Sequence, residues 1–295
     1  MDPRRLLIFR AVARAGSISA AARQLGWTQP AVSQHLRALE REAGSALLLR
    51  GSTGVELTEP GRVLLARADA VASHLHMAEE ELSAIGDLRR GLVRLVAYPT
   101  AAATWAPGAL AGLRRRHPDI DVTLTEMEPP EAVALLERGD ADLALVFGYD
   151  ADPVAGSREL RWVPVGAEPV DLVLPPDHPG GGKRRMGMAQ LSDESWIAGC
   201  DRCRAHLVGL CEAAGFTPDI RHVSDDYVVV QNLVAAGLGI SMLPRSATAA
   251  YRNPAVQVRP SRSWGVRRFG IAHRDGADTV PANAALIREL HKHRL

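Results

Sequence analysis

The segment from Ser17 to Arg37 constrains the fold of this chain more than any other. It reads SISAAARQLGWTQPAVSQHLR, two short helical stretches separated by Gly26, a residue suited to a tight turn. Helical spacing predicts an apolar face on the first stretch, formed by Ile18, Ala21, Ala22 and Leu25. Ser17 and Thr28 are the expected N-caps of the two helices, and Pro30 is tolerated in the first turn of the second. This arrangement is typical of a helix-turn-helix, whose second helix enters the DNA major groove.

The second helix of the pair carries a polar face. Its apolar residues Val32, Leu36 and Leu39 recur at helical spacing and are expected to face the core. The side chains expected to point outward together are Gln29, Ser33, Gln34 and Arg37. Glutamine can pair with adenine, serine with several base edges or a phosphate, and arginine with guanine or a phosphate. This chemistry favours DNA contact over the alternative, a solvated face of a small helical bundle.

A short β-ribbon is predicted at residues 47–57 (LLLRGSTGVEL), around the turn Gly51-Ser-Thr-Gly54. Such a ribbon would form a wing and place Arg50 at a phosphate or in the minor groove. A plain connecting hairpin is the alternative. The residues expected to contact DNA are Thr28, Gln29, Pro30, Ser33, Gln34, Arg37 and Arg50.

A long helix is predicted from Thr58 to about Asp87, with apolar residues that alternate four and three positions apart. The residues of this seam are Leu64, Ala68, Val71, Leu75, Ala78, Leu82 and Ile85. Three heptads of this kind indicate a coiled coil. Its simplest partner is the same helix of a second copy, which would present two recognition helices to two DNA half-sites. Packing against the chain's own core is the alternative.

The charge of the chain limits where nucleic acid could bind. The formal net charge of the 295 residues is only +1, so a basic surface must be local, and residues 1–60 hold eight arginines against five acidic residues. The excess of arginine over lysine is typical of a GC-rich bacterial genome. Neither a membrane span nor a secretory signal is expected, because the apolar run from Leu6 to Phe9 is short and is followed by Arg10. We therefore expect a cytoplasmic protein with reduced thiols and no membrane partner.

The chain resembles the LysR-type transcriptional regulators over essentially its full length. The matching residues are Phe9, 17–24 (SISAAARQ), 28–40 (TQPAVSQHLRALE), Arg50, Leu57, Thr58 and Gly61. Two positions depart from the family pattern: Leu48 stands where phenylalanine is usual, and Pro60 where alanine is common. The resemblance implies a homodimer, assembled into a tetramer as a dimer of dimers. It also implies that the partners are promoter DNA, a small-molecule effector and RNA polymerase.

Beyond Gly91 short apolar runs alternate with amphipathic helices, which predicts an α/β fold with parallel strands covered by helices. The expected strands are 93–97, 120–125, 143–147, 170–174, 195–198 and 240–243. The expected helices are 105–116, 131–138, 205–214, 226–236 and 282–293. In such folds ligands bind beyond the carboxyl ends of the strands.

The resemblance implies a C-terminal effector domain similar to a periplasmic binding protein, with two α/β lobes. The block VAAGLGISMLP at 234–244 resembles the second lobe of these regulators. Two strands would cross between the lobes, near 162–166 and 267–271. The expected organisation is a winged helix-turn-helix at 1–58, a linker and dimerisation helix at 59–90, and an effector-binding domain at 91–295. Within that domain, lobe I would comprise 91–164 and 268–295, and lobe II 165–267.

Thr100 is the first candidate for the effector site. It follows the first strand and begins a helix, so its hydroxyl and nearby N–H groups could hold an anion; a simple N-cap is the alternative. The acidic residues Glu126 and Glu128 argue against an ordinary carboxylate ligand nearby. Of the pair Asp225-Asp226, one is expected to cap a helix, and the other could bind a cationic group. The predicted effector contacts are Thr100, Ala101, Glu128, Pro129, Phe147, Cys200, Asp201 and Asp225.

The segment 196–211 (WIAGCDRCRAHLVGLC) contains all three cysteines and leaves three interpretations open. The thiols of Cys200, Cys203 and Cys211 could simply line the cleft or pack as small hydrophobes. They could bind zinc with His206, although the spacing fits no standard zinc module. Alternatively they could form a redox switch, since Cys200 and Cys211 fall near the paired cysteines of peroxide-sensing members of the family.

These features predict a DNA-binding transcriptional regulator whose promoter engagement changes when an effector binds between the lobes. The alternative is a thiol- or peroxide-responsive regulator that uses Cys200 and Cys211. A solute-binding protein with a helical extension fits less well, because its recognition-helix chemistry would be unexplained. An enzyme that pairs Cys200 with His206 or His222 lacks an oriented base. We expect no catalytic residue, metal or cofactor, and the effector is unknown.

Overall fold

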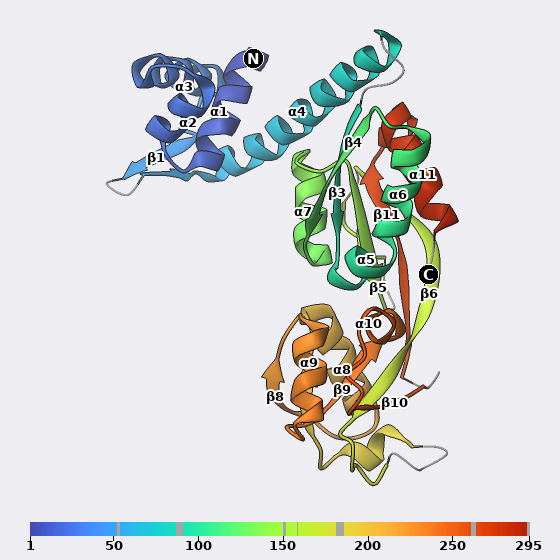
Figure 1. Ribbon diagram of the computed structural model, residues 1–295. Coiled ribbons are helices and arrows are strands. Elements are labelled where there is room, and N and C mark those ends of the chain that lie inside the picture. Colours follow the sequence, from blue (N-terminus) through green and yellow to red (C-terminus); the bar gives the residue numbers. More distant parts are fainter. Residues whose placement is uncertain are drawn as a thin grey trace. The chain divides into compact units, whose positions relative to one another are not determined.

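The computed structural model describes residues 1–51, 54–86, 91–149, 152–157, 159–180, 186–260 and 264–293. The chain divides into two compact units (Figure 1). The first comprises Met1–Leu82 and Glu137–Asp140, and the second comprises Ser83–Leu136 and Ala141–Leu295.

The first unit begins with a helical bundle and a hairpin. Its elements are α1 (Pro3–Ala15), α2 (Ile18–Leu25), α3 (Gln29–Ala43), β1 (Leu48–Gly51), β2 (Gly54–Leu57) and α4 (Glu59–Gly86). Phe9, Val12, Leu36 and Leu39 lie at the centre of one apolar core shared by α1, α2 and α3. The strands β1 and β2 pair antiparallel. The predicted helix-turn-helix and hairpin are therefore confirmed, although Ser52 and Thr53 at the hairpin tip lie outside the described residues.

The caps of the helix pair differ from one another. The Ser17 Oγ accepts a hydrogen bond from the Ala20 N–H at 3.4 Å, and Gly26 has a φ of +66°, both as expected. Thr28 occupies the N-cap position of α3, but its side chain makes no capping hydrogen bond, so that expectation is wrong. Leu25 is also exposed rather than part of the apolar face, because it is the last residue of α2.

The long helix α4 starts where the Thr58 Oγ1 accepts a hydrogen bond from the Gly61 N–H at 3.0 Å. The early seam residues are covered by the chain itself: Leu64 packs against the core of the bundle and Ala68 is fully buried. Further along, Leu75 is 46% exposed and Ala78 is exposed. The side chains of Leu82 and Ile85, and all of Asp87, lie outside the described residues. The first two seam residues, Leu64 and Ala68, thus pack on the chain's own core, which was the alternative. Leu75 and Ala78, further along the helix, form an apolar surface that the chain itself does not cover.

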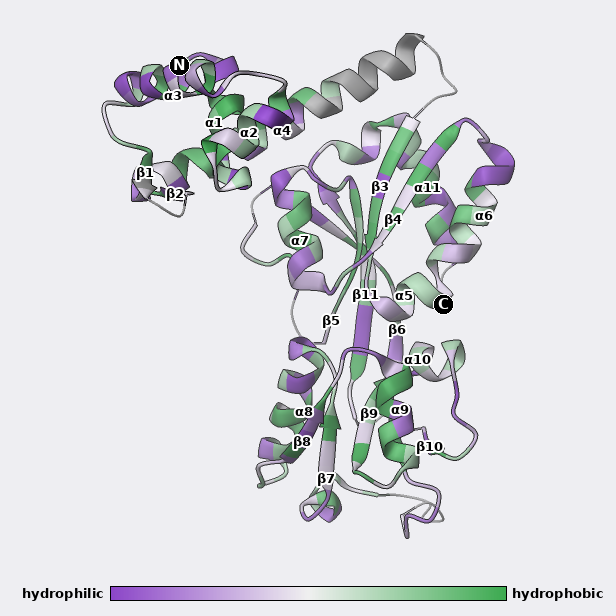
Figure 2. Ribbon diagram, turned by 60° about the vertical axis from the view of Figure 1, so that its left-hand side comes forward, coloured by the Kyte–Doolittle hydropathy of each residue, from purple (hydrophilic) through white to green (hydrophobic). Residues whose placement is uncertain are grey.

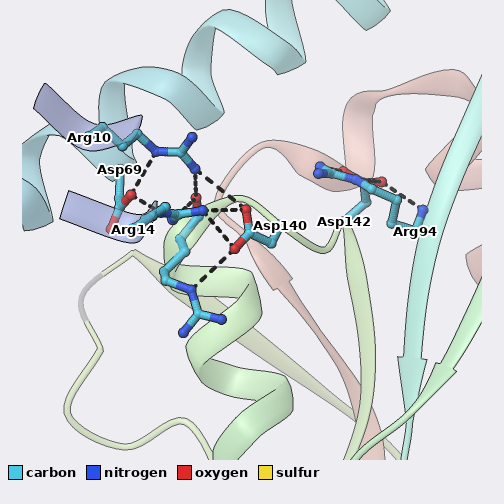
Figure 3. Close-up of polar contacts among 7 residues, drawn as sticks. Arg10, Arg14, Asp69, Arg94, Asp140 and Asp142 are labelled. Carbon is cyan, nitrogen blue, oxygen red and sulfur yellow. Dashed lines mark hydrogen bonds and ion pairs between the residues drawn. The ribbon is translucent and has the colours of Figure 1, made fainter. Parts of the chain in front are cut away.

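A charge cluster ties α1 to α4 within the first unit (Figure 3). Asp69 is buried, and its Oδ1 accepts hydrogen bonds from Arg10 Nε at 2.7 Å and Arg14 Nη2 at 2.6 Å. Arg14 Nη1 also contacts Asp140 Oδ1 at 2.6 Å. Partial burial acts to raise the pKa of Asp140, but hydrogen bonds and charge from Arg14, Arg138 and Arg10 hold it below its ordinary value. The cluster therefore favours the ionised form of this carboxyl group.

The second unit is built on one mixed sheet. Its strands are β3 (Gly91–Ala97), β4 (Ile120–Glu126), β5 (Leu143–Gly148), β6 (Leu160–Leu174), β7 (Ser195–Ala198), β8 (Asp219–Val223), β9 (Ile240–Pro244), β10 (Gln257–Arg259) and β11 (Val266–Arg274). They lie in the order β4-β3-β5-β11-β6-β9-β7-β8, with β10 paired to β6. The first part of β6 pairs with β11 and its last part with β9 and β10, so β6 and β11 connect the two halves of the sheet. The α/β class and the six expected strands are confirmed. The short strands β8 and β10 carry too few apolar residues to be predicted.

Helices cover both halves of this sheet. They are α5 (Pro99–Thr104), α6 (Ala106–Arg116), α7 (Pro129–Arg138), α8 (Asp201–Ala213), α9 (Tyr227–Ala235), α10 (Arg245–Ala250) and α11 (Pro281–Lys292), with short 3-10 turns at Met188–Leu191 and Ala277–Thr279. Hydrophobic residues dominate β3, whereas α6 shows both polar and apolar residues (Figure 2). The expected helices are confirmed, but α8 begins four residues earlier than predicted. Among the described residues, no helix is long and apolar enough to cross a membrane.

Candidate DNA-binding face and effector pocket

The exposed face of α3 is the candidate DNA-binding surface. Most of the predicted contacts on or beside this helix are exposed. They are Thr28, Gln29, Pro30, Gln34 and Arg37. Ser33 is only 5% exposed, so its expected outward orientation is wrong. Ser33 is adjacent to Val32 and Leu36, which both lie in the core. Because α3 packs against both α1 and α2, the buried face of α3 is wide enough to include Ser33. The backbone of Arg50 lies in β1, but its side chain lies outside the described residues.

A pocket in the second unit is lined from both halves of the sheet. Its volume is about 40 Å³, and its lining includes Tyr98, Thr100, Glu128, Phe147, Cys200 and Arg267. A wider groove of about 410 Å³ shares Glu128, Cys200 and Asp225 with it. Glu128 follows β4, Phe147 lies near the end of β5, and Cys200 follows β7. The pocket therefore forms at the carboxyl ends of strands, the usual place for ligands in α/β folds.

Arg267 organises the inner wall of this pocket. Its side chain, in a residue only 2% exposed, donates from Nη2 to Glu168 Oε1 at 2.6 Å and to Thr100 Oγ1 at 2.7 Å. The guanidinium carbon lies 4.8 Å from the ring centre of Tyr98 and 4.5 Å from that of Phe147. Burial acts most strongly, to lower the pKa of Arg267, but Glu168, Tyr98, Tyr149 and Cys203 together outweigh it, so the pKa is raised. The guanidinium therefore stays charged and is neutralised by a buried carboxylate.

The sequence did carry a signal for Arg267, which our predictions missed. Side chains alternate along a strand, so Arg267, Phe269 and Ile271 share one face of β11, and Phe269 and Ile271 lie in the apolar core. An arginine therefore stands on an apolar strand face. Such a residue needs a partner, because an unpaired buried charge is very costly. The partner itself, Glu168, could not be found locally because it lies 99 residues away.

Two of the predicted effector contacts, Ala101 and Pro129, line neither the pocket nor the groove, whereas Thr100 lines the pocket. Thr100 is the second residue of α5, so it is not an N-cap; its hydroxyl accepts a hydrogen bond from Arg267, and the residue lines the pocket as predicted. Ala101 is fully buried in the core and does not line the pocket. Pro129 is buried at the start of α7, and Pro130 lines the groove in its place. Ala101 packs in the same apolar core as the β3 residues Leu95 and Ala97.

The other predicted contacts lie at the pocket or groove. Phe147 lines the pocket, Asp201 lines the groove, and Asp225 lines both. Asp226, the neighbour of Asp225, caps α9, and its Oδ1 accepts a hydrogen bond from the Val228 N–H at 2.7 Å. The prediction that one of the two aspartates caps a helix is therefore confirmed. Asp225 is thereby left facing the pocket.

Two buried oxygen atoms at the pocket lack a hydrogen-bond partner among the described residues. They are the Tyr98 hydroxyl, in a side chain 1% exposed, and Glu128 Oε2. Burial is the main reason that the pKa of Glu128 is raised, and the nearby Asp225 and Glu131 raise it further, although the Cys200 thiol and Arg267 act in the opposite direction. Burial also raises the pKa of Tyr98. The pocket therefore offers hydrogen-bonding capacity that the chain itself leaves unused.

Cys200 lies beside Cys203 rather than beside Cys211. Cys200 Sγ lies 3.1 Å from Cys203 Sγ, and the Tyr149 hydroxyl donates to Cys203 Sγ at 3.4 Å. Cys211 packs in a different apolar cluster, eight residues along α8 from Cys203, or about 12 Å at 1.5 Å per residue. Cys200 and Cys211 are thus not neighbours in this structure. Both Cys200 and Cys203 line the pocket.

The two neighbouring thiols also differ in acidity. A hydrogen bond from Cys200 is the main reason that the pKa of Cys203 lies below its ordinary value, and Arg267 and the Tyr149 hydroxyl act in the same direction. The pKa of Cys200 is raised by its hydrogen bond to Cys203 and by burial, whereas burial raises that of Cys211 to about 11. Cys203 is therefore the thiol most easily ionised, and the thiolate is the reactive form.

The zinc interpretation does not match the geometry. The His206 ring stacks on Tyr149 at 3.9 Å, and its Nε2 contacts the Trp264 carbonyl oxygen at 2.8 Å. In the described part of the chain, no three histidine, cysteine or acidic side chains are grouped so that they could hold a metal ion. His206 therefore acts as a packing residue.

A helix-turn-helix followed by a two-part α/β unit with a pocket defines a DNA-binding regulator with a ligand-binding domain. Residues 3–62 match the family model described as bacterial regulatory helix-turn-helix protein, lysR family, and residues 86–294 match the LysR substrate binding domain. The chain belongs to the LysR family of transcriptional regulators.

Known relatives agree with this assignment. The chain is 32% identical to a probable hydrogen peroxide-inducible genes activator of Mycobacterium avium, over 97% of this chain and 93% of that protein. It is 27% identical to the transcriptional regulator MetR of Escherichia coli, over 99% and 90% of the two chains. Among solved structures, a full-length OxyR variant from Pseudomonas aeruginosa is similar with a TM-score of 0.75 at 23% identity, covering 98% and 94%. CbnR complexed with its target DNA gives a TM-score of 0.65 at 24% identity, covering 100% of both chains.

Proposed function

We propose that this chain regulates transcription in response to a small molecule that binds the pocket around Glu128 and Arg267. The observation that carries this proposal is the pair of buried oxygen atoms, Tyr98 Oη and Glu128 Oε2, which line a cavity and lack partners among the described residues. Buried polar groups are nearly always hydrogen-bonded, so a ligand would complete this site. The pocket takes residues from both halves of the sheet, and a ligand there would favour one arrangement of the halves over others.

The DNA contacts of this proposal come from α3 and the hairpin. Gln29, Gln34 and Arg37 are exposed and would read base edges or hold phosphates, with Thr28 and Pro30 at the helix start and Arg50 on the wing. The exposed Leu75 and Ala78 of α4 would meet a second copy of the chain. A dimer formed in this way would present two copies of α3 to DNA.

A reporter fused to the DNA upstream of the chain's own gene tests the proposal. Ser224 lines the pocket, and Ser224→Phe would fill the cavity without touching the DNA-binding unit. We expect this variant to bind the DNA normally but to hold the reporter at one level, while the wild-type output changes with growth conditions. Arg37→Ala, the matched control, should instead weaken the DNA binding itself. A wild-type-like response in Ser224→Phe would contradict the pocket's role.

A second candidate is a thiol response to peroxide, which the contact between Cys200 and Cys203 favours. The Cys203 thiolate would attack one oxygen of hydrogen peroxide and break the O–O bond, giving a sulfenic acid and a hydroxide ion that takes up a proton from solvent to become water. Cys200 would then attack that sulfur, giving a disulfide and a second water molecule. This pair differs from the pair Cys200–Cys211 that the family resemblance suggested.

Thiol counting after peroxide treatment separates the pairings. The wild type and Cys211→Ser should each lose two maleimide-reactive thiols, with the disulfide mapped to one peptide that contains Cys200 and Cys203. Cys203→Ser should form no such disulfide. A disulfide that includes Cys211 would contradict the assigned pair.

A further inference from the structure

The charged residues around the pocket indicate what kind of ligand it accepts. Four carboxylates line the pocket and the adjoining groove: Glu128, Glu131, Asp201 and Asp225. Within the described part of the chain, none of them forms an ion pair with a basic side chain. The basic residue that shares the groove, Arg202, donates to the carbonyl oxygens of Phe147 and Pro153 at 3.4 and 3.2 Å. The groove therefore carries an excess of negative charge.

The one other cation at the pocket, among the described residues, is already paired with a carboxylate. Arg267 is bonded to Glu168 through Nε at 3.0 Å and through Nη2 at 2.6 Å, and Ser246 Oγ accepts from the same Nη2 at 3.0 Å. The rings of Tyr98 and Phe147 lie against its guanidinium. An anionic ligand would have to compete with a buried carboxylate for this arginine, and it would meet four further carboxylates around it.

The two unpartnered oxygen atoms of the pocket also favour a ligand that donates hydrogen bonds. A carboxylate oxygen such as Glu128 Oε2 can only accept hydrogen bonds, and the Tyr98 hydroxyl can accept one as well. Tyr98 is almost completely buried and still has no partner among the described residues, so its hydroxyl group is positioned for something that enters the pocket. Ammonium and guanidinium groups supply several donors at one point together with the compensating charge.

We propose that the effector is an organic cation whose ammonium or guanidinium group binds Glu128 and Tyr98 in the pocket. The small pocket, about 40 Å³, receives the head group, and the groove of about 410 Å³ receives the remaining chain. Asp201 lies in the groove, so a ligand with a second positive charge gains a further partner there. This inference rests on the proposed function, because it names the ligand class for the same pocket.

Three four-carbon probes that differ only in their end groups test the ligand class: 1,4-diaminobutane, 1,4-butanediol and succinate. Their binding to the full-length protein is measured by calorimetry at constant ionic strength. We expect the diamine alone to bind, and Glu128→Gln to weaken it by about tenfold to a hundredfold, the usual cost of losing a charged hydrogen bond. Glu212→Gln removes an exposed carboxylate of α8 away from the pocket and should leave the affinity unchanged.

Cysteine alkylation shows where the probe binds. Cys203 lines the pocket, whereas Cys211 is buried in a separate cluster and serves as the internal reference. The diamine should slow the reaction of iodoacetamide with Cys203 and leave Cys211 unchanged. This protection should disappear in Glu128→Gln.

The results of these two experiments test the proposed ligand class separately from the proposed function of the pocket. Succinate that binds more tightly than the diamine and protects Cys203 overturns the cationic class while the pocket keeps its proposed function. Equal diamine affinity in Glu128→Gln and the wild type overturns the assigned contact. If no probe binds and Cys203 reacts equally under all conditions, both the ligand class and the pocket's function are contradicted.

Discussion

Replacing Glu168 by glutamine should leave a buried positive charge without its counterion. Glu168 and Arg267 are 6% and 2% exposed and lie 2.6 Å apart at their closest atoms. With their charge centres about 4 Å apart, the attraction is about 4 kcal/mol at an effective dielectric constant near 20. Glutamine would keep neutral hydrogen bonds to Ser246 or Arg267 that are worth about 1 kcal/mol. We therefore expect Glu168→Gln to destabilise the second unit by about 3 kcal/mol.

Calorimetric melting of the full-length protein measures this loss. For a unit of roughly 200 residues, about 3 kcal/mol corresponds to a decrease in Tm of roughly 6–12 °C in the transition of that unit. Adding Arg267→Met should recover part of the loss, because an apolar side chain replaces an unpaired buried charge. Asp275→Asn, which breaks the exposed pair with Arg161, is the control and should not shift the transition measurably. A Tm change in Glu168→Gln no larger than in this control would refute the reasoning.

Three further predictions concern the first unit. Arg37→Ala should weaken specific DNA binding by about 1–3 kcal/mol in a gel-shift assay without changing the melting of the second unit, and an unchanged affinity would remove it from the interface. Leu75→Glu should lower the dimer population in sedimentation, because it places charge on an exposed apolar position of α4; an unaltered distribution would place the dimer contact elsewhere. Because the pKa of folded Asp140 lies below its ordinary value of 3.8, its contribution to stability is full above that value and is lost as pH falls through the folded pKa. Acid titration of Asp140→Asn should therefore show a shallower loss of stability below about pH 4 than the wild type, and parallel curves would contradict the ion pair with Arg14.

The local parts of the fold were predictable from sequence because neighbouring residues determine them. Ser17 caps α2, Gly26 takes a positive φ and the apolar spacing sets the core of the bundle, all within one segment. Ser33 shows the limit of this reasoning, because its burial depends on two other helices packing on either side of α3. Helical spacing alone identifies the centre of a buried face but leaves its width open.

The pocket was harder to predict because its residues meet through sheet topology. The sequence placed Glu128, Phe147, Cys200, Asp201 and Asp225 at strand or helix ends, and the structure brings these residues to the pocket or groove. It could not reveal the pairing of Arg267 with Glu168, which depends on how β6 and β11 run side by side.

The contact between Cys200 and Cys203 was not predicted, for a different reason. The start of α8 was predicted four residues too late, whereas the observed start at Asp201 places Cys200 and Cys203 together on its first turn. The same shift puts Cys211 two turns further along the helix, in another core.

Footprinting of the full-length protein on the DNA upstream of its own gene tests the central claim most directly. The measurement compares untreated protein with protein bound to 1,4-diaminobutane and with protein treated with peroxide. A regulator controlled through this pocket should protect a defined site, lose that protection in Arg37→Ala, and change its footprint with the diamine or with peroxide. No protected site, or an identical footprint under all three conditions, would contradict the account.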